Sequence, residues 1–73
     1  MFIRKEILKK LRKQYPPGTR VELIRMEDIQ SPPIGTQGTV IGVDDIGSIM
    51  VSWDNGSSLS VVHGEDSCRK LEG

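Results

Sequence analysis

The stretch IMVSWDNGSSLSVV, from Ile49 to Val62, decides the fold of this chain. On both sides of its central Asp54-Asn55-Gly56, apolar residues occupy every second position, which is the pattern of strands that bury one face. An Asn-Gly pair between two such runs is a strong signal for a hairpin. The sequence therefore predicts a β-hairpin in this stretch.

The register of this hairpin depends on the length of its loop. A two-residue loop would divide the apolar residues between the two faces of the hairpin. A three-residue loop pairs Val51 with Leu59 and Ile49 with Val61, which collects the apolar side chains on one face. We therefore expect a type I turn followed by a left-handed Gly56 in a G1 bulge.

The rest of the chain predicts three more strands, at residues 19–25, 38–43 and 67–71. Residues 26–37 are rich in Pro, Gly, Ser and acidic residues and form a long loop for so small a domain, and such loops are often functional. Five short strands, one long loop and one tight hairpin predict a small five-stranded SH3-like barrel. The expected fold class is mainly β with one N-terminal α-helix. The helix occupies residues 1–15, the barrel occupies residues 16–73, and no internal repeat is apparent.

Residues 2–15 form the predicted helix, which is amphipathic and basic. Its apolar residues recur every four positions, and the Pro16-Pro17-Gly18 segment ends it. So short a helix is marginal in water on its own, so its apolar stripe must dock on another surface. On the register above, Ile41 and Met50 point away from the core and form either the docking site of the helix or an exposed interaction patch. We expect helix docking, in the same chain or across a dimer. The stripe consists of Ile3, Ile7, Leu11 and Tyr15.

Composition excludes several classes of protein. A chain of 73 residues makes one small domain, and its single cysteine, Cys68, indicates a reducing compartment or a thiol that never pairs. We therefore expect a cytoplasmic protein. No apolar run reaches the length of a membrane span, so a membrane partner is not expected.

The charge is balanced overall and uneven along the chain. Residues 1–13 carry six basic residues and one acidic residue, whereas residues 14–73 carry four basic and nine acidic residues. A basic arm on an acidic body indicates either an anionic partner for the arm or an attraction between arm and body.

Three separated motifs, in this order, resemble a known family. PGTRVEL at residues 17–23, GTQGTV at 35–40 and VSWDNGS at 51–57 are similar to short bacterial proteins catalogued only as a domain of unknown function, found in Firmicute genomes, phages and conjugative elements. The resemblance covers residues 16–71. It implies an SH3-like barrel and no assigned activity.

A more distant resemblance is to the Mib–Herc domain of eukaryotic ubiquitin ligases. That domain shares a Gly-Thr-Val strand and a Val-x-Trp-Asp-Asn-Gly hairpin, and it is similar to a peptide-binding module. This chain departs from it between Met26 and Ile34, where the aromatic and Gly-Asp-rich residues are missing. The Gly-Thr-Val element is also similar to the KOW motif of ribosomal proteins and elongation factors.

Catalysis has little support in this sequence. A single His63 at a turn cannot build a Ser-His-acid arrangement, and nothing beside Cys68 would lower its pKa. The acidic pairs Asp44-Asp45 and Glu65-Asp66 lie next to glycines, where carboxylates usually accept backbone hydrogen bonds in turns. We therefore expect no enzyme activity, no catalytic residues, no metal and no cofactor.

Two binding functions remain. The first is binding of a protein or peptide through the long loop and the hairpin, with Trp53 either in the core or as a half-exposed anchor. The alternative is binding of nucleic acid through the basic helix, with the protein a monomer or a helix-mediated homodimer. The protein-binding candidates are Met26, Asp28, Ile29, Pro32, Pro33, Trp53 and Asn55. The nucleic-acid candidates are Arg4, Lys5, Lys9, Lys10, Arg12 and Lys13.

Overall fold

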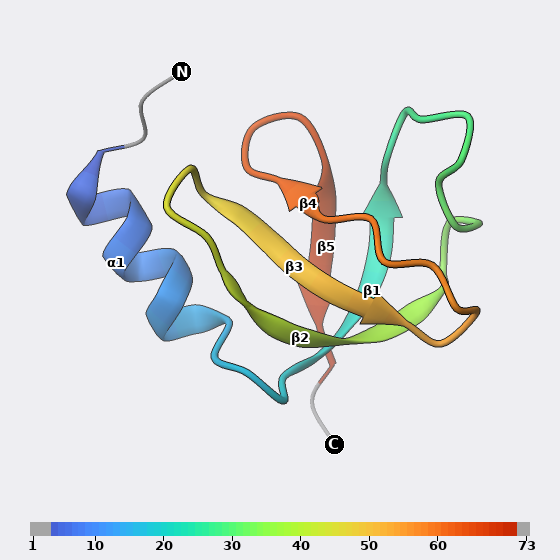
Figure 1. Ribbon diagram of the computed structural model, residues 1–73, viewed down its shortest axis with the longest axis horizontal. Coiled ribbons are helices and arrows are strands. Elements are labelled where there is room, and N and C mark those ends of the chain that lie inside the picture. The colour runs from blue at the N-terminus through green and yellow to red at the C-terminus, as the bar shows by residue number, and fades with distance from the viewer. Residues whose placement is uncertain (1–3, 72–73) are drawn as a thin grey trace.

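The computed structural model describes residues 4–71 of the chain (Figure 1). One helix precedes five strands, so the mainly β fold class is confirmed. Phe2 and Ile3, which belong to the predicted helix, lie outside the described residues. The elements are α1 (Lys5–Gln14), β1 (Arg20–Arg25), β2 (Gln37–Val43), β3 (Ser48–Trp53), β4 (Val61–Val62) and β5 (Ser67–Lys70).

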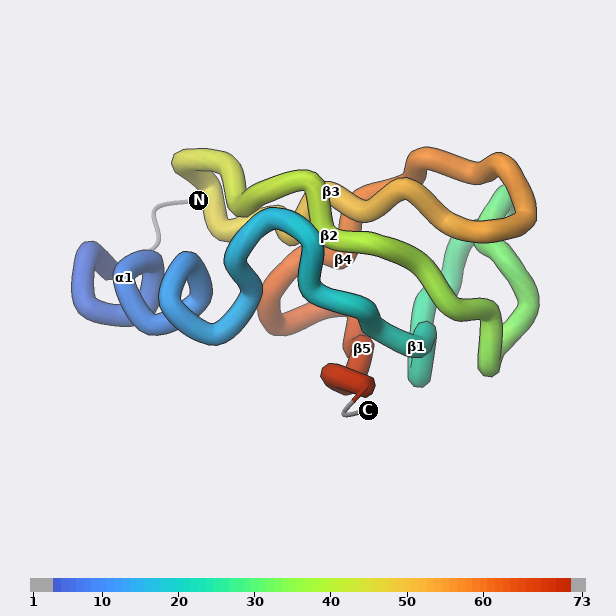
Figure 2. Tube along the Cα trace, turned by 90° about the horizontal axis from the view of Figure 1, so that it is seen from below, coloured from blue at the N-terminus to red at the C-terminus, as the bar shows by residue number. Residues whose placement is uncertain are grey.

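The five strands form one antiparallel sheet in the order β4-β3-β2-β1-β5. Figures 1 and 2 show that the sheet curves strongly, so that β5 lies across from β3. The edge strands are β4 and β5, and no ladder joins them within residues 4–71. Closure of the sheet into a barrel therefore stays a prediction.

The alternating residues of the strands form the core. Side chains of β1 and β3 are buried at every second position, as the period-two pattern predicts. Burial of apolar surface is the main favourable term in folding, so these residues hold the domain together. The core cluster contains Leu11, Val21, Leu23, Met26, Val40, Ile49, Val51, Trp53 and Val61.

The helix docks within its own chain. Leu11 is 7% exposed and belongs to the core cluster, and Ile7 and Tyr15 pack against that cluster. The expected docking site was wrong, because Ile41 remains 57% exposed on the outer face of β2. The helix instead lies beside the turn between β2 and β3 (Figure 1), where Leu11 and Tyr15 face the core residues Ile49 and Val61 across a small cavity. Covering the core removes more apolar surface from water than covering one outer residue.

The turn of the opening hairpin has the predicted form. The Gly56 amide donates to the Trp53 carbonyl at 3.0 Å, and the Trp53 amide donates to the Ser57 carbonyl at 2.9 Å. Gly56 has φ of +93°, the left-handed conformation of a G1 bulge. Ile49 pairs with Val61, so this part of the predicted register is confirmed.

The predicted pairing of Val51 with Leu59 was wrong. Residues 57–60 leave the sheet, and β4 contains only Val61 and Val62. The indole Nε1 of Trp53 donates a hydrogen bond to the Leu59 carbonyl at 2.8 Å. A buried indole N–H needs an acceptor. The Leu59 carbonyl accepts this hydrogen bond, so it points toward the Trp53 ring and does not pair with β3.

The same turn occurs twice, at Pro16–Thr19 and Pro33–Thr36, although no internal repeat was expected. In both turns the threonine amide and hydroxyl donate to the proline carbonyl, at 3.1 and 2.6 Å in the first and 3.0 and 2.7 Å in the second. The turn glycines have φ of +93° and +94°, and their amides donate to the carbonyls of Val40 and Leu23, each at 2.8 Å. The two turns therefore stand at opposite ends of the ladder between β1 and β2.

Within residues 4–71, the structure contains no helix whose length and apolar character would let it cross a bilayer.

Candidate functional site

The basic residues of the N-terminal segment are all exposed. The helix buries Leu11 toward the sheet, so its opposite side faces solvent. Figures 1 and 2 show α1 at one end of the molecule, beside the turn between β2 and β3. Five of the candidate cations lie in α1, and the sixth, Arg4, is its N-cap. The exposed candidates are Arg4, Lys5, Lys9, Lys10, Arg12 and Lys13.

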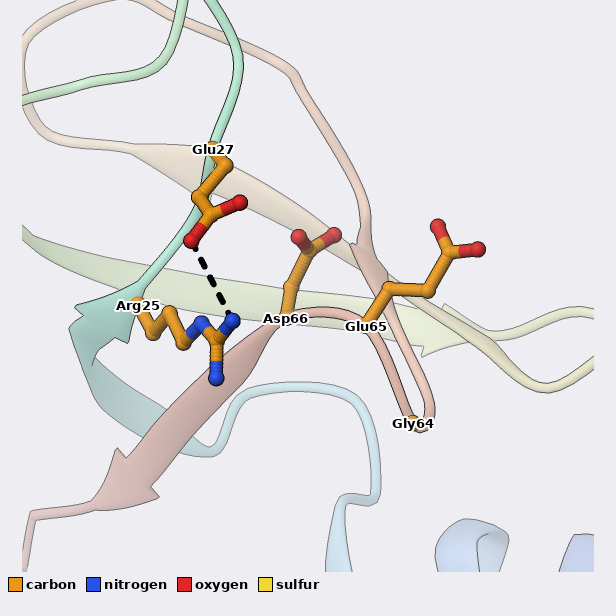
Figure 3. Close-up of a pocket in the computed structure, with 5 residues that line it drawn as sticks. All are labelled: Arg25, Glu27, Gly64, Glu65 and Asp66. Atoms are coloured by element: carbon orange, nitrogen blue, oxygen red, sulfur yellow. Dashed lines mark hydrogen bonds and ion pairs between the residues drawn. The ribbon is translucent and has the colours of Figure 1, made fainter.

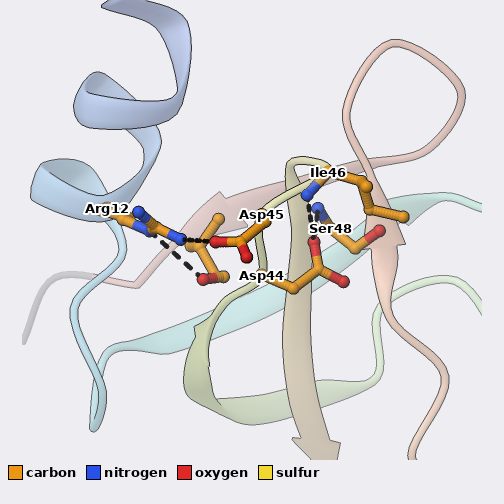
Figure 4. Close-up of polar contacts among 6 residues, drawn as sticks. Arg12, Asp44, Asp45, Ile46 and Ser48 are labelled. Atoms are coloured by element: carbon orange, nitrogen blue, oxygen red, sulfur yellow. Dashed lines mark hydrogen bonds and ion pairs between the residues drawn. The ribbon is translucent and has the colours of Figure 1, made fainter. Parts of the chain in front are cut away.

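One of these six cations is held by the sheet. Arg12 Nη2 lies 2.7 Å from Asp45 Oδ1, and its Nε donates to the Val43 carbonyl at 3.4 Å (Figure 4). Attraction between basic arm and acidic body, one of the two expected alternatives, is therefore realised at this contact. The pair is exposed, with Asp45 94% accessible, so it contributes little to stability.

The lysines of α1 outnumber its single acidic residue, Glu6, and none of them forms an ion pair among the described residues. Within residues 4–71, the arginines at positions 20, 25 and 69 pair with the acids at positions 54, 27 and 22, whereas no lysine forms an ion pair. The uncompensated positive charge therefore gathers on α1, which we call the basic face. It consists of Lys5, Lys9, Lys10 and Lys13.

A polar network that sequence analysis missed ties the hairpin to the sheet. The guanidinium of Arg20 lies 2.9 and 2.6 Å from the two carboxylate oxygens of Asp54, and it donates to Thr39 Oγ1 at 2.8 Å. The hydrogen bond from Arg20 lowers the pKa of Asp54, and the same bond raises the pKa of Arg20. No local motif signals this contact, because it joins residues that are far apart in the sequence.

The loop candidates divide into buried and exposed residues. Met26, Pro32 and Trp53 are buried, with Trp53 only 2% exposed, so the core alternative for Trp53 is confirmed. These three side chains cannot meet a partner while the domain is folded. The remaining candidates are exposed: Asp28, Ile29, Pro33 and Asn55.

The structure does bring the long loop and the hairpin together. The Asp54 amide donates to the Gln37 carbonyl at 2.9 Å, and Figure 1 shows both segments at the end of the molecule opposite α1. Ile29 is 100% exposed and Ile34 is 60% exposed, so this end presents apolar side chains to solvent. The two predicted surfaces are therefore separate.

An acidic cavity of about 360 Å³ lies between the loop and the turn before β5 (Figure 3). Its lining includes Glu65, Asp66 and the ion pair of Arg25 with Glu27, whose atoms are 3.2 Å apart. Within residues 4–71, no group of three or more His, Cys, Asp or Glu residues is arranged to hold a metal ion.

Two of the four turn acids, Asp44 and Asp66, act as expected, whereas Asp45 pairs with Arg12. Asp44 Oδ1 accepts the amides of Ile46 and Ser48 at 3.1 and 2.8 Å (Figure 4). Asp66 Oδ2 accepts the Val62 amide at 3.0 Å. These carboxylates satisfy backbone donors, which is the turn role predicted for them.

A smaller cavity, of about 220 Å³, separates α1 from the sheet. Tyr15 and Cys68 meet there, beside Leu11, Ile49 and Val61. Burial raises the pKa of the Cys68 thiol, and a hydrogen bond with Tyr15 offsets only part of this effect; burial raises the pKa of Tyr15 as well. The thiol therefore stays protonated near neutral pH and is a poor nucleophile.

Comparison with known families matches residues 4–71 to one family model, described as "Domain of unknown function (DUF4314)". No curated protein and no solved structure matches the chain significantly.

Proposed function

We propose that this chain, which belongs to the DUF4314 family, is a non-enzymatic binding domain whose ligand is nucleic acid. The observation that carries the proposal is the basic face of α1. Its lysines are exposed, lie on one side of a docked helix and form no ion pair among the described residues. Such a surface gains free energy from a dense line of phosphates, because binding releases the counterions that surround them.

Salt provides the first test. Each phosphate that the protein neutralises contributes about −0.9 to the slope of log K against log salt for duplex DNA. Four lysines would therefore lose roughly 150-fold in affinity between about 50 and 200 mM salt. Binding to labelled mixed-sequence DNA and RNA is measured by fluorescence anisotropy across this range.

Charge reversal provides the second test. The triple variant Lys9→Glu, Lys10→Glu and Lys13→Glu should abolish binding, because it turns most of the basic face acidic. Lys70→Glu is the matched control, since Lys70 is exposed on β5 and lies outside α1. The control should bind as the wild type does. No binding of the wild type to either polymer at low salt contradicts the proposal.

A second candidate function is protein binding at the opposite end of the molecule. The observation that favours it is the exposure of Ile29, Ile34 and Pro33 in one loop beside the hairpin. Apolar side chains held out to solvent are typical of interaction surfaces. Capture of partners from a native lysate tests it, with Ile29→Ser combined with Ile34→Ser as the loop variant. A partner that both proteins recover equally would contradict this function.

The biological context, compartment and oligomeric state of the domain belong to the same proposal. The resemblance in residues 16–71 supports a bacterial or mobile-element context, and the single thiol of Cys68 supports the cytoplasm. Docking of α1 on its own sheet supports a monomer over a helix-mediated dimer. The protonated Cys68 and the turn roles of Asp44 and Asp66 support a binding function over an enzymatic one.

A further inference from the structure

We propose that the basic face binds double-stranded DNA by its backbone, across the major groove, without reading base sequence. This inference rests on the proposed nucleic-acid function and narrows its ligand. It follows from the exposed lysines of α1, from the polar and aromatic side chains that are engaged elsewhere in the fold, and from the size of the helix.

The basic face offers few of the side chains that read bases with fixed geometry. Sequence readout in the major groove relies on bidentate pairs, from Arg or Lys to guanine and from Asn or Gln to adenine, and the planar fork of Arg fixes such a pair where the flexible ammonium of Lys does not. Arg12 is engaged by Asp45 and the Val43 carbonyl, and Gln14, which is exposed, lies beside the cavity between α1 and the sheet. Arg4 is exposed at the N-cap, before the first residue of α1. The basic face itself offers lysines, which act on phosphates as point charges.

The described aromatic residues cannot stack on unpaired bases. Proteins that bind single strands combine a basic groove with exposed aromatic rings. Trp53 is 2% exposed, and Tyr15 is half-buried with its side chain against Cys68. A duplex, whose bases are already stacked, makes no such demand.

The distribution of the lysines fits a groove with phosphates on both sides. At about 100° per residue, Lys5 and Lys10 lie about 140° apart around the helix, with Lys9 and Lys13 between them. Glu6 is the one acidic residue in α1, and Lys10 one turn later offsets it. A single row of lysines along the helix would face the phosphates of one DNA strand, whereas lysines spread over this angle can face the phosphates of both strands.

The helix has the size and the freedom that the major groove requires. Seven of the ten residues of α1 are exposed, and Figure 2 shows the helix at the end of the molecule. A helix about 10–12 Å across fits the major groove of B-DNA, which is about 12 Å wide. The major groove of duplex RNA is too deep and narrow for this. Insertion into a membrane is disfavoured, because the apolar stripe of α1 already packs on the core.

Competition among defined ligands tests this inference with the full chain. The probes are two DNA duplexes of unrelated sequence, an RNA duplex, the matching single strands and vesicles containing phosphatidylserine. We expect equal affinity for the two DNA duplexes within about twofold, weaker binding of every other probe and a salt slope near −3.6 for four lysines. Lys5→Gln and Lys10→Gln should each make the slope shallower by about 0.9, and Lys70→Gln should not change it.

The outcomes that overturn the inference differ from the failure of the proposed function. Tighter binding of single strands, of RNA duplex or of vesicles, or a clear preference between the two DNA sequences, overturns the inference alone. If no nucleic acid binds at low salt, the inference and the proposed function fail together.

Discussion

The ring of Trp53 lies directly over the backbone of Gly38. A β-carbon built on Gly38 would be 2.8 Å from Cε3 of that ring, 2.7 Å from a methyl of Val51 and 2.9 Å from the Ser52 carbonyl. Gly38 is paired with Trp53 across the β2–β3 ladder, so the absence of a side chain on one strand makes room for the largest side chain of the other. The core therefore depends on this glycine.

Replacement of Gly38 by alanine should strongly destabilise the domain. The added methyl group meets backbone as well as side chains, so the core cannot relax around it without moving a strand. We expect a loss of about 1–3 kcal/mol, measured by urea denaturation followed through Trp53 fluorescence. Gly42→Ala is the control, because a β-carbon there meets only the Met50 methyl, at 3.5 Å. Equal losses from the two variants would contradict this account.

The adjacent acids Asp44 and Asp45 should respond differently to substitution by alanine. Asp45→Ala frees Arg12, so binding to duplex DNA should strengthen and the salt slope should steepen by about 0.9. Asp44→Ala removes the acceptor of two backbone amides, so it should lower stability by about 1–2 kcal/mol. Anisotropy and urea denaturation on both variants separate these effects. Weaker DNA binding by Asp45→Ala would show that the Arg12 contact assists binding.

The pair of Arg20 with Asp54 predicts a change in stability with pH. The pKa of Asp54 is lower in the folded protein than its ordinary value of 3.8, mainly because Arg20 donates hydrogen bonds to it. The stabilisation is therefore complete above pH 3.8 and disappears as the pH falls through the lower pKa of the folded state. The stability difference between wild type and Asp54→Asn should stay constant above this range and shrink below it. A difference that persists into strong acid would contradict this interpretation.

The raised pKa of Cys68 predicts slow alkylation. Iodoacetamide reacts with the thiolate, so its reaction with the folded protein should have a midpoint above pH 9.0, the ordinary value for the group. Tyr15→Phe removes the hydrogen bond that lowers this pKa and should move the midpoint higher. The urea-denatured protein is the control and should react at the ordinary pH. Rapid alkylation of the folded protein at neutral pH would show that the thiol is accessible and activated.

Local rules predicted the hairpin turn, and a tertiary contact changed the strand that follows it. The three-residue loop and left-handed Gly56 follow from residue types within a few positions of each other. The missing pairing of Val51 with Leu59 follows from the hydrogen bond of the Trp53 indole, which depends on the ring being buried. Sequence patterns do not predict which way a buried side chain points, or which backbone group it reaches.

The candidate surfaces likewise combine features that the local sequence predicts with features that depend on tertiary contacts. The exposure of the α1 lysines follows from helical periodicity, which the sequence displays. The capture of Arg12 by Asp45, and the burial of Met26 and Pro32, depend on which segments meet after folding. Burial of a loop residue depends on the distant segments that pack against it, so loop composition alone wrongly predicted Met26 and Pro32 at the surface.

The two Pro-x-Gly-Thr turns determine where the chain tolerates insertions and deletions. Because one turn stands at each end of the β1–β2 ladder, adding a residue between Thr19 and Leu23 would disrupt at least one of them together with the strand pairing. The exposed segment around Ile29 lies outside both turns, and its length does not set the register of any strand. Extra residues, or a peptide tag, inserted there should leave the fold intact.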